Sequence, residues 1–218
     1  SGDWPAKPLL VFLRQLTNGD ALLRMQGGTP ALVNKLIEGI TIKSGSPIEY
    51  VGEQGEQVAV NTAAGEVEFF DRVVVATPTT KLAEFLDKTQ FKEDIALLSQ
   101  FKFEEGDLVI HTDNTVMPPK RKDWAVLSYM MDRQFVRQQF TVWLNAVEPS
   151  LVGKNPVFQT WRPVTEIDPK KVISRVTLTR AVVDSNTISL NQQIQARHHD
   201  ANRKVFYCGS WSCDGLPI

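Results

Sequence analysis

The stretch DRVVVATP, residues 71–78, decides how the first half of the chain is interpreted. Val73, Val74 and Val75 form a continuous apolar run, which is typical of a strand covered on both faces in a parallel sheet. Thr77-Pro78 ends this strand. The sequence therefore predicts that this segment is a strand of a parallel sheet that stops at Thr77.

The segments before this stretch predict strands and helices. TIKSGSPIEYV (41–51), QVAVNT (57–62) and EVEFFDRVVVAT (66–77) alternate with period two and are separated by glycine turns. GGTPALVNKLIEGI (27–40) predicts a helix with Thr29 as N-cap, Pro30 in the first turn and Gly39 as its stop, with one apolar face. WPAKPLLVFLRQL (4–16) predicts a buried helix, and TTKLAEFLDK (79–88) predicts a short one.

Beyond about residue 98 the pattern changes to strands without intervening helices, which favours an antiparallel sheet. These strands are FKFEEGDLVIHTD (101–113), WAVLSYMMD (124–132), QQFTVWLNAV (138–147), PVFQTWRP (156–163) and VISRVTLTRAV (172–182). SLNQQIQARHHD (189–200) predicts one more helix. VFYC (205–208) then predicts a buried strand that runs into the turn beginning at Gly209.

These two patterns predict an α+β fold with two parts. Residues 1–26 and 89–203 form a mostly antiparallel or mixed sheet domain with flanking helices, of the type that holds a substrate. Residues 27–88 and 204–218 form part of a nucleotide-binding α/β domain. The chain should leave the smaller part near residue 89 and return to it near residue 204.

Composition excludes several classes of protein. The 24 basic and 25 acidic residues give a net charge of −1, which offers no electrostatic case for binding nucleic acid or an anionic membrane. No apolar run approaches a membrane span, and no secretory signal is visible. Two cysteines without an export signal favour a reduced cytoplasmic compartment. Cys208, Cys213, His198 and His199 lack the spacing of a zinc site.

Single candidates for catalysis are few. His111 lies at a strand end beside an acid, so a Ser-His-Asp arrangement with Ser128 or Ser210 is one alternative, and a structural histidine is the other. Lys120, in the basic run 120–122, is the second base that merits a test. The aromatic residues of successive strands fit either a sheet core or the lining of an apolar pocket. They are Trp124, Tyr129, Trp143, Phe158 and Trp161.

Taken in order, these segments resemble the flavin-containing amine oxidase superfamily. The Gly-Gly helix, SPIEYV, a second strand, DRVVVATP, a helix and the final YCGSWSCDGLPI follow one another as they do there. More narrowly, VIHTDNTVMPPKRKDWAVLSY, FTVWLNAV and NPVFQTWRP resemble bacterial NAD/FAD-binding oxidoreductases often encoded beside fatty-acid-modifying enzymes. The resemblance covers essentially the whole chain, and its specificity lies in the ordered set.

The resemblance implies a set of FAD contacts. The backbone of Ile48 would hold adenine, Gly27 and Gly28 would allow close approach of the main chain, and Ala76, Thr77 and Pro78 would lie at the carboxyl edge of the sheet. The turn from Gly209 through Asp214, Gly215 and Leu216 would place backbone N–H groups at the N1–C2=O end of the flavin. Relatives tend to have a Gly-Phe-His-Glu-Asp-Gly-like stretch where this chain has Ser212-Cys213-Asp214-Gly215.

The resemblance also implies that the parent protein is an FAD-dependent oxidoreductase. It would oxidise an apolar or amphipathic substrate by hydride transfer to flavin; the alternative is a non-catalytic binding or scaffold domain. The family's first strand, its dinucleotide-binding glycine loop and its acidic ribose ligand have no counterpart in the sequence. We therefore expect a fragment that lacks oxidase activity, binds FAD weakly by itself and self-associates through an apolar face near Val73, Val74 and Val75.

Overall fold

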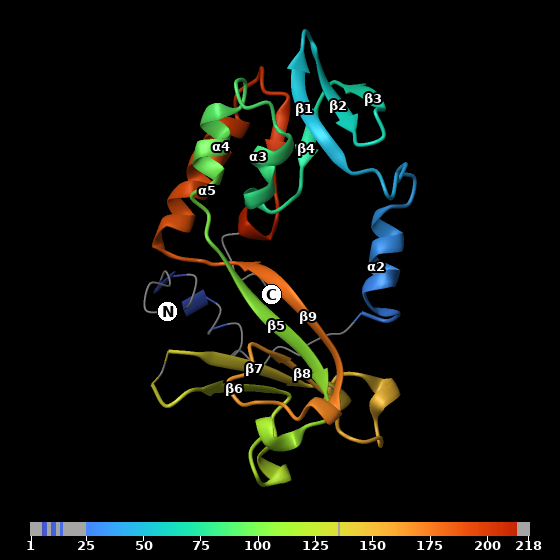
Figure 1. The fold of residues 1–218 in the computed structure, drawn as a ribbon, viewed down its shortest axis with the longest axis vertical. Coiled ribbons are helices and arrows are strands. Elements are labelled where there is room, and N and C mark those ends of the chain that lie inside the picture. Colours follow the sequence, from blue (N-terminus) through green and yellow to red (C-terminus); the bar gives the residue numbers. More distant parts are fainter. Residues whose placement is uncertain (1–5, 8–9, 12–13, 15–24, 135, 213–218) are drawn as a thin grey trace. The chain divides into compact units, whose positions relative to one another are not determined.

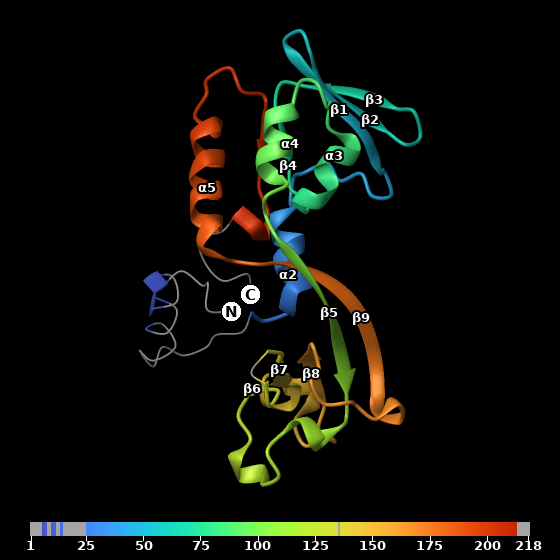
Figure 2. The ribbon, with the colours of Figure 1, turned by 60° about the vertical axis from the view of Figure 1, so that its left-hand side comes forward.

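The structure is a computed structural model that describes residues 1–218 with the exception of 1–5, 8–9, 12–13, 15–24, 135 and 213–218. The chain forms two compact units, Ser1–Phe103 with Ala181–Ile218, and Glu104–Arg180. Figures 1 and 2 show the elements of each unit. The α+β fold class is confirmed, because helices accompany antiparallel sheets and a parallel strand pair.

The first unit contains a three-stranded antiparallel sheet in the order β1-β2-β3. Its strands are β1 (Ile48–Gln54), β2 (Gln57–Thr62) and β3 (Val67–Phe70). The turns that join them contain Gly55 and Gly65, whose φ angles of 60° and 83° are accessible to glycine without strain. The predicted hairpin turns are therefore present.

The predicted strand 66–77 is wrong as a single element. Asp71-Arg72 interrupts it, so that β3 pairs with β2 while β4 (Val73–Val75) pairs with β10 (Val205–Tyr207) in a separate parallel pair. The parallel character expected of the valine run is present. Covering on both faces is not, since Val75 is 6% exposed but Val74 is 63% exposed.

Helices pack around this parallel pair. They are α3 (Leu82–Phe85), α4 (Lys92–Leu98) and α5 (Ser185–His198). Asp184 caps α5, because its carboxylate accepts the N–H groups of Asn186 and Thr187 in a capping box, so the helix begins four residues before the predicted start. The core beneath these elements includes Val51, Val58, Val75, Leu82, Leu98, Leu190, Ile194, Val205 and Trp211.

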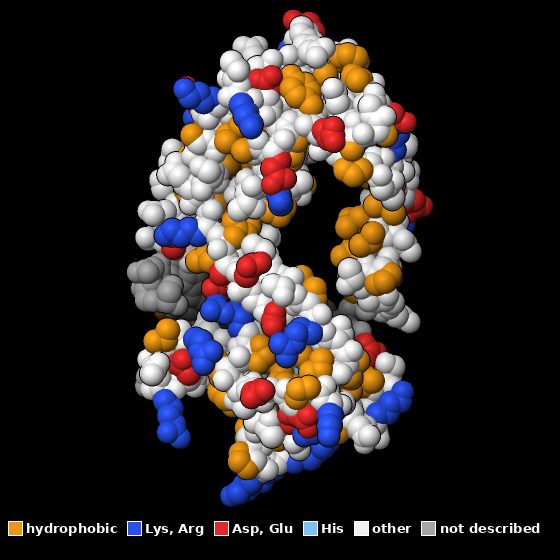
Figure 3. Space-filling view, in the orientation of Figure 1, with side chains coloured by type: hydrophobic (Ala, Val, Ile, Leu, Met, Phe, Trp, Pro, Cys, Tyr) orange, Lys and Arg blue, Asp and Glu red, His pale blue; other side chains and the backbone are white. Residues whose placement is uncertain are grey.

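Helix α2 (Gly28–Leu36) differs from its prediction in two ways. Its N-cap is Gly27 rather than Thr29, and no side chain caps it. Its apolar face, Leu32, Val33 and Leu36, is 39%, 44% and 65% exposed, and hydrophobic side chains of this kind are visible at the surface in Figure 3. An amphipathic pattern identifies which face of a helix is apolar, but it does not identify the surface that packs against that face.

Little of the predicted helix 4–16 can be compared with the structure. Ala6, Lys7, Leu10, Val11 and Arg14 are helical, and the other positions lie largely outside the described residues. Leu10 is 64% exposed, so the expectation that its side chain is buried is wrong.

The second unit is built on a five-stranded sheet in the order β6-β7-β8-β5-β9, separate from the sheet of β1–β3. Its strands are β5 (Phe103–His111), β6 (Leu127–Met131), β7 (Gln138–Trp143), β8 (Phe158–Trp161) and β9 (Val172–Ala181). The pairs β6–β7, β7–β8 and β8–β5 are antiparallel, as the strand-rich pattern predicts.

The compact units divide near residues 103 and 181, whereas the sequence places functional boundaries near 26, 88 and 203. Those boundaries rest on the change in sequence pattern rather than on contacts, and they stay a prediction. None of the helices in the described ranges combines the length and the apolar character needed to cross a bilayer.

Candidate functional site

The carboxyl edge of the β4–β10 pair brings together residues from opposite ends of the sequence. Because the two strands are parallel, Ala76, Thr77 and Pro78 after β4 and Gly209 after β10 meet at one edge. The N–H of Cys208 donates to the carbonyl oxygen of Val75 at 3.0 Å and extends the pairing to this edge. Four of the predicted cofactor contacts therefore share one place in the fold.

Cys208 is exposed just beyond β10. The prediction that this cysteine is buried in the strand is wrong, because β10 ends at Tyr207 and the side chain of the following residue points away from the core. No group of three or more potential metal ligands occurs in the described part of the chain.

The turn at this edge depends on a glycine packed against Trp211. A Cβ atom at Gly209 would lie 2.5 Å from Nε1 of Trp211, so no other residue fits without movement of the ring or backbone. Trp211 is 3% exposed, and its indole N–H donates to the carbonyl oxygen of Thr77 at 3.0 Å. Its ring packs edge-on against Phe101 at 4.8 Å. Trp211 thus joins the two segments that form the edge.

Sequence reasoning did not select Trp211. Its only signal was an aromatic residue inside a glycine turn, GSWS, which by itself does not reveal a partner in residue 77.

Two threonine hydroxyl groups at the same edge lack a partner in the described residues. Thr79 is 4% exposed, and neither its Oγ1 nor that of Thr77 makes a hydrogen bond. A buried polar group left unpaired costs about 1–3 kcal/mol. These two hydroxyls are therefore buried hydrogen-bonding groups without a partner at the edge where the resemblance places the cofactor.

Strand β10 is held in place by a buried carboxylate on α4. Asp94 is 5% exposed and accepts hydrogen bonds from Arg197 at 2.8 Å, from the hydroxyl of Tyr207 at 3.0 Å and from Arg203. Burial, and then the charge of Asp94, raises the pKa of Tyr207, so this phenol stays neutral. His198 Nε2 accepts the backbone N–H of Tyr207 at 3.1 Å.

The remaining predicted cofactor contacts lie on other elements. Gly27 and Gly28 begin α2 with φ angles of 80° and 66°, and a Cβ at Gly27 would lie 2.8 Å from the Cβ of Ala31. Local helix geometry therefore explains Gly27. Ile48 is the first residue of β1, 39% exposed and paired with Thr62. Asp214, Gly215 and Leu216 lie outside the described residues. Cofactor binding by all of these positions stays a prediction.

His111 is not arranged as a catalytic base. It is fully buried, its Nδ1 accepts the N–H of Asp113 at 3.1 Å, and its Nε2 therefore carries the proton and donates to Thr160 Oγ1 at 2.8 Å. Burial lowers the pKa of His111 and keeps the ring neutral.

The Asp113 carboxylate bonds groups other than the His111 ring. Burial alone would raise its pKa, but hydrogen bonds from the Asp168 N–H, from Lys171 and from Thr115 outweigh burial and lower the pKa to about 2. No Ser-His-Asp arrangement forms around His111, because its hydroxyl partner is a threonine and its acidic neighbour bonds other groups. Lys120 lies exposed in a loop.

The register of the five-stranded sheet divides the predicted aromatic residues between its two faces. Trp143 lies opposite Phe158 on the buried face, where Trp124 packs edge-on against both at 5.4 Å, although Trp124 itself follows a 3-10 turn and is not on a strand. Tyr129 lies opposite Phe140, and Phe140 opposite Trp161, on the other face.

We call this second face the open face; it consists of Leu108, Leu127, Tyr129, Phe140 and Trp161. Tyr129 is 69% exposed and Leu127 is 39% exposed. Trp161 lies against Gly106, where a Cβ would be 2.7 Å from the ring, and beneath the guanidinium of Arg180 at 5.0 Å. The sheet-core interpretation is confirmed for Phe158, Trp124 and Trp143, while the pocket-lining interpretation stays a prediction for Tyr129 and Trp161.

Solved structures share the fold of this chain. A protein described as a protoporphyrinogen oxidase from Exiguobacterium sp. 255-15 aligns with a TM-score of 0.57 and 12% identity over 94% of this chain and 51% of its own. A CLA-producing fatty acid isomerase from P. acnes aligns with 0.55 and 13% over 87% and 48%, and a reduced UDP-galactopyranose mutase with 0.54 and 12% over 86% and 46%. No curated protein sequence matches the chain.

These likenesses define a flavoprotein oxidoreductase-like fold. The family model of flavin containing amine oxidoreductases matches residues 6–115, half of the chain. The chain belongs to this family, as its segment order suggested. It spans about half the length of the similar structures.

Proposed function

We propose that the whole protein is an FAD-dependent oxidoreductase that works in the cytoplasm and that the β4–β10 edge contacts its flavin ring. The observation that carries the proposal is the buried, unpaired hydroxyl of Thr79 beside the Gly209 turn, in a chain whose family is named for its flavin. Bound FAD would supply hydride-accepting chemistry at this edge.

The chain's own residues would bind and orient the cofactor. Gly209 and the 3-10 turn Ser210–Ser212 bring main chain to the edge, Trp211 fixes the separation of the two strand ends, and the threonine hydroxyls offer donors and acceptors to a polar ring. The contact between Asp94 on α4 and Arg203, which precedes β10, holds this strand in place. The backbone of Ile48 is our candidate for the adenine contact.

The substrate is proposed to be apolar or amphipathic. The open face of the five-stranded sheet supports this, because Tyr129 and Leu127 expose apolar side chains on it. Neither His111 nor Lys120 has the geometry of a base, so we assign no proton transfer to this chain.

FAD titration tests the proposal. We expect the 218-residue chain to bind FAD with a Kd above about 1 µM, because its sequence has no glycine loop for the two phosphates. If the gene encodes a longer product, that product should purify with flavin absorbance. Failure of every product to take up FAD would contradict the proposal and favour the scaffold alternative.

A hydroxyl-specific variant sharpens the test. Thr79→Val removes an unpaired buried hydroxyl, so it should leave folding stability unchanged or higher while weakening FAD binding several-fold. Thr80→Val, in the same 3-10 turn but exposed, is the matched control and should change neither. Equal affinity of the two variants would remove Thr79 from the site.

A further inference from the structure

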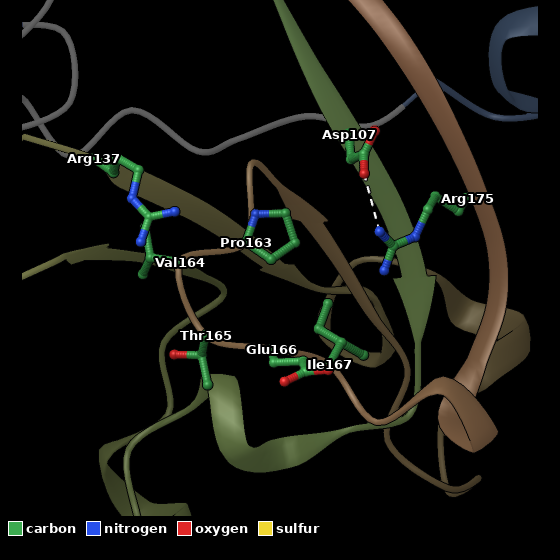
Figure 4. A pocket seen from close by; sticks show the side chains of 8 residues that line it. All are labelled: Asp107, Arg137, Pro163, Val164, Thr165, Glu166, Ile167 and Arg175. Carbon is green, nitrogen blue, oxygen red and sulfur yellow. Dashed lines mark hydrogen bonds and ion pairs between the residues drawn. The ribbon is translucent and has the colours of Figure 1, made fainter.

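A cavity of about 290 Å³ lies within the second unit, where the chain crosses the sheet after β8. Figure 4 shows Arg137 and Arg175 on opposite sides of the loop Pro163–Ile167, with Glu166 below and between them. The residues come from β5, the β6–β7 hairpin, this loop and β9. They are Asp107, Arg137, Pro163, Val164, Thr165, Glu166, Ile167 and Arg175.

The loop that lines the cavity is fixed at both ends. The N–H of Val164 donates to Oε1 of Gln139 at 3.0 Å, and the N–H of Asp168 donates to the carboxylate of Asp113 at 3.0 Å. Ile167, the last residue of the loop, is 2% exposed. These contacts hold the loop in one conformation.

The loop also begins with backbone strain. Arg162 has a φ of 50° and is the one non-glycine residue with positive φ among the described residues. Such a conformation costs on the order of 1–3 kcal/mol and persists only where the surroundings over-determine it, which is characteristic of ligand clamps.

A buried polar network connects the two anchors. Gln139, Thr141, Thr160 and His111 are all fully buried. Gln139 donates to Thr141 at 3.4 Å, the hydroxyls of Thr141 and Thr160 are 3.0 Å apart, and His111 donates to Thr160. His111 in turn accepts the N–H of Asp113. Such satisfied networks are rigid, so the cavity wall is preorganised.

The charges in the cavity are not all paired with one another. Arg175 donates to Asp107 at 3.0 Å, and Asp107 also accepts the hydroxyl of Thr177 at 2.9 Å. Arg137 uses only its Nε, which lies 3.4 Å from Asp132, so its two terminal nitrogens have no partner among the described residues. Glu166 is exposed and likewise makes no side-chain hydrogen bond there. Of the four charged residues that line the cavity, Arg175 and Asp107 are therefore paired with each other, while Arg137 and Glu166 keep hydrogen-bonding capacity.

We propose that this cavity binds a small zwitterion that carries a carboxylate, an ammonium group and a short apolar side chain. The carboxylate would meet the free guanidinium nitrogens of Arg137, and the ammonium group the carboxylate of Glu166. The apolar side chain would pack on Pro163, Val164 and Ile167. A simple anion would be repelled by Glu166 and a simple cation by Arg137.

The volume is consistent with a ligand of this size. Sites for drug-sized molecules begin at about 300 Å³, so the cavity suits a molecule as small as an amino acid and not a nucleotide. The site lies wholly within residues 104–180 and shares no residue with the proposed flavin contacts, so it stands independently of the proposed function.

Three matched probes test the charge requirement on the full 218-residue chain. The probes are L-leucine, L-leucinamide and 4-methylpentanoate, which share one apolar side chain. L-Leucine carries both charges, L-leucinamide carries only the ammonium group, and 4-methylpentanoate carries only the carboxylate. Isothermal titration and amide chemical shifts should give saturable leucine binding with a Kd of about 1 mM or lower. Each of the other two probes should bind roughly tenfold more weakly. No saturable leucine binding, or equal affinity for all three, would overturn the proposal.

Variants locate the binding. Arg137→Gln and Glu166→Gln should each weaken leucine binding roughly tenfold while leaving the circular dichroism spectrum unchanged, because both side chains are exposed. Arg133→Gln removes the same charge from the same hairpin outside the cavity and should have no effect. Leucine binding that survives both cavity variants, or falls equally in Arg133→Gln, would place the site elsewhere.

Discussion

At the scale of single residues, neighbours decide the role of a side chain that the sequence only nominates. His111 was a candidate base because it is a histidine beside an acid. In the structure its Nδ1 accepts a backbone N–H and its Nε2 donates to a threonine, so both nitrogens are used for structure. At Gly209 a neighbour decides which residue fits, because the ring of Trp211 occupies the space that a side chain would need.

The His111 network makes a prediction at this scale. Thr160→Val removes the acceptor of the His111 N–H and should lower the free energy of unfolding by about 1–3 kcal/mol, as measured by urea denaturation. Thr179→Val, on the exposed surface of β9, is the control and should change stability by no more than about 0.5 kcal/mol. Similar values for the two variants would show that the network does not stabilise the sheet.

At the scale of elements, pairing separates strands that are continuous in sequence. Residues 66–77 alternate as one strand, but β3 joins an antiparallel sheet and β4 a parallel pair with the last strand of the chain. β4 ends up with a side chain, Val74, that points to solvent at 63% exposure. An exposed apolar side chain on the face of a strand is a candidate surface for self-association.

A substitution at this strand tests that proposal. Val74→Lys should reduce self-association in sedimentation experiments at raised protein concentration, while stability changes by no more than about 0.5 kcal/mol because the side chain is already exposed. Val152→Lys, at 70% exposure in a turn of the second unit, is the matched control. A wild-type chain that stays monomeric throughout, or two variants that behave alike, would refute the proposal.

At the scale of the whole molecule, buried titratable groups should make stability fall in two stages as pH is lowered. Burial lowers the pKa of His111, and burial followed by the charge of Arg203 lowers that of His198, from the ordinary value of 6.5. The unfolded chain then binds protons that the folded chain does not. The histidines therefore leave the free energy of unfolding undiminished above pH 6.5, and they reduce it as the pH falls below 6.5.

The second stage belongs to Asp113. Its pKa of about 2, against an ordinary 3.8, gives a contribution of about 2 kcal/mol that is present above pH 3.8 and lost as pH falls through 2. Urea unfolding between pH 8 and pH 2, followed by tryptophan fluorescence, measures both stages. Stability that rises between pH 7 and pH 5 would contradict the histidine assignment. Asp113→Asn should reduce the loss of stability at acid pH, and the remainder should come from Asp87, Asp132 and Asp184, whose pKa values hydrogen bonds also lower.

Much of this protein follows from local sequence. Period-two patterns, glycine turns and the switch from mixed to strand-rich segments locate most strands, because strand periodicity and turn chemistry are properties of neighbouring residues. The valine run of 73–75 indicated a parallel pair, and the order of segments indicated the flavin family before any contact was known. The Gly209 turn was also recognisable, since a glycine between a strand and a polar loop is a local signal.

Only the tertiary structure decided which surfaces meet. The pairing of β4 with β10, the bond from Trp211 to Thr77, and the path from Gln139 to His111 join residues far apart in the chain. Only the tertiary structure likewise decided that the apolar face of α2 is exposed and that Arg137, Glu166 and Arg175 line one cavity. Periodicity fixes which side of an element is apolar or polar, but pairing and register depend on the summed free energy of long-range contacts, which no local pattern contains.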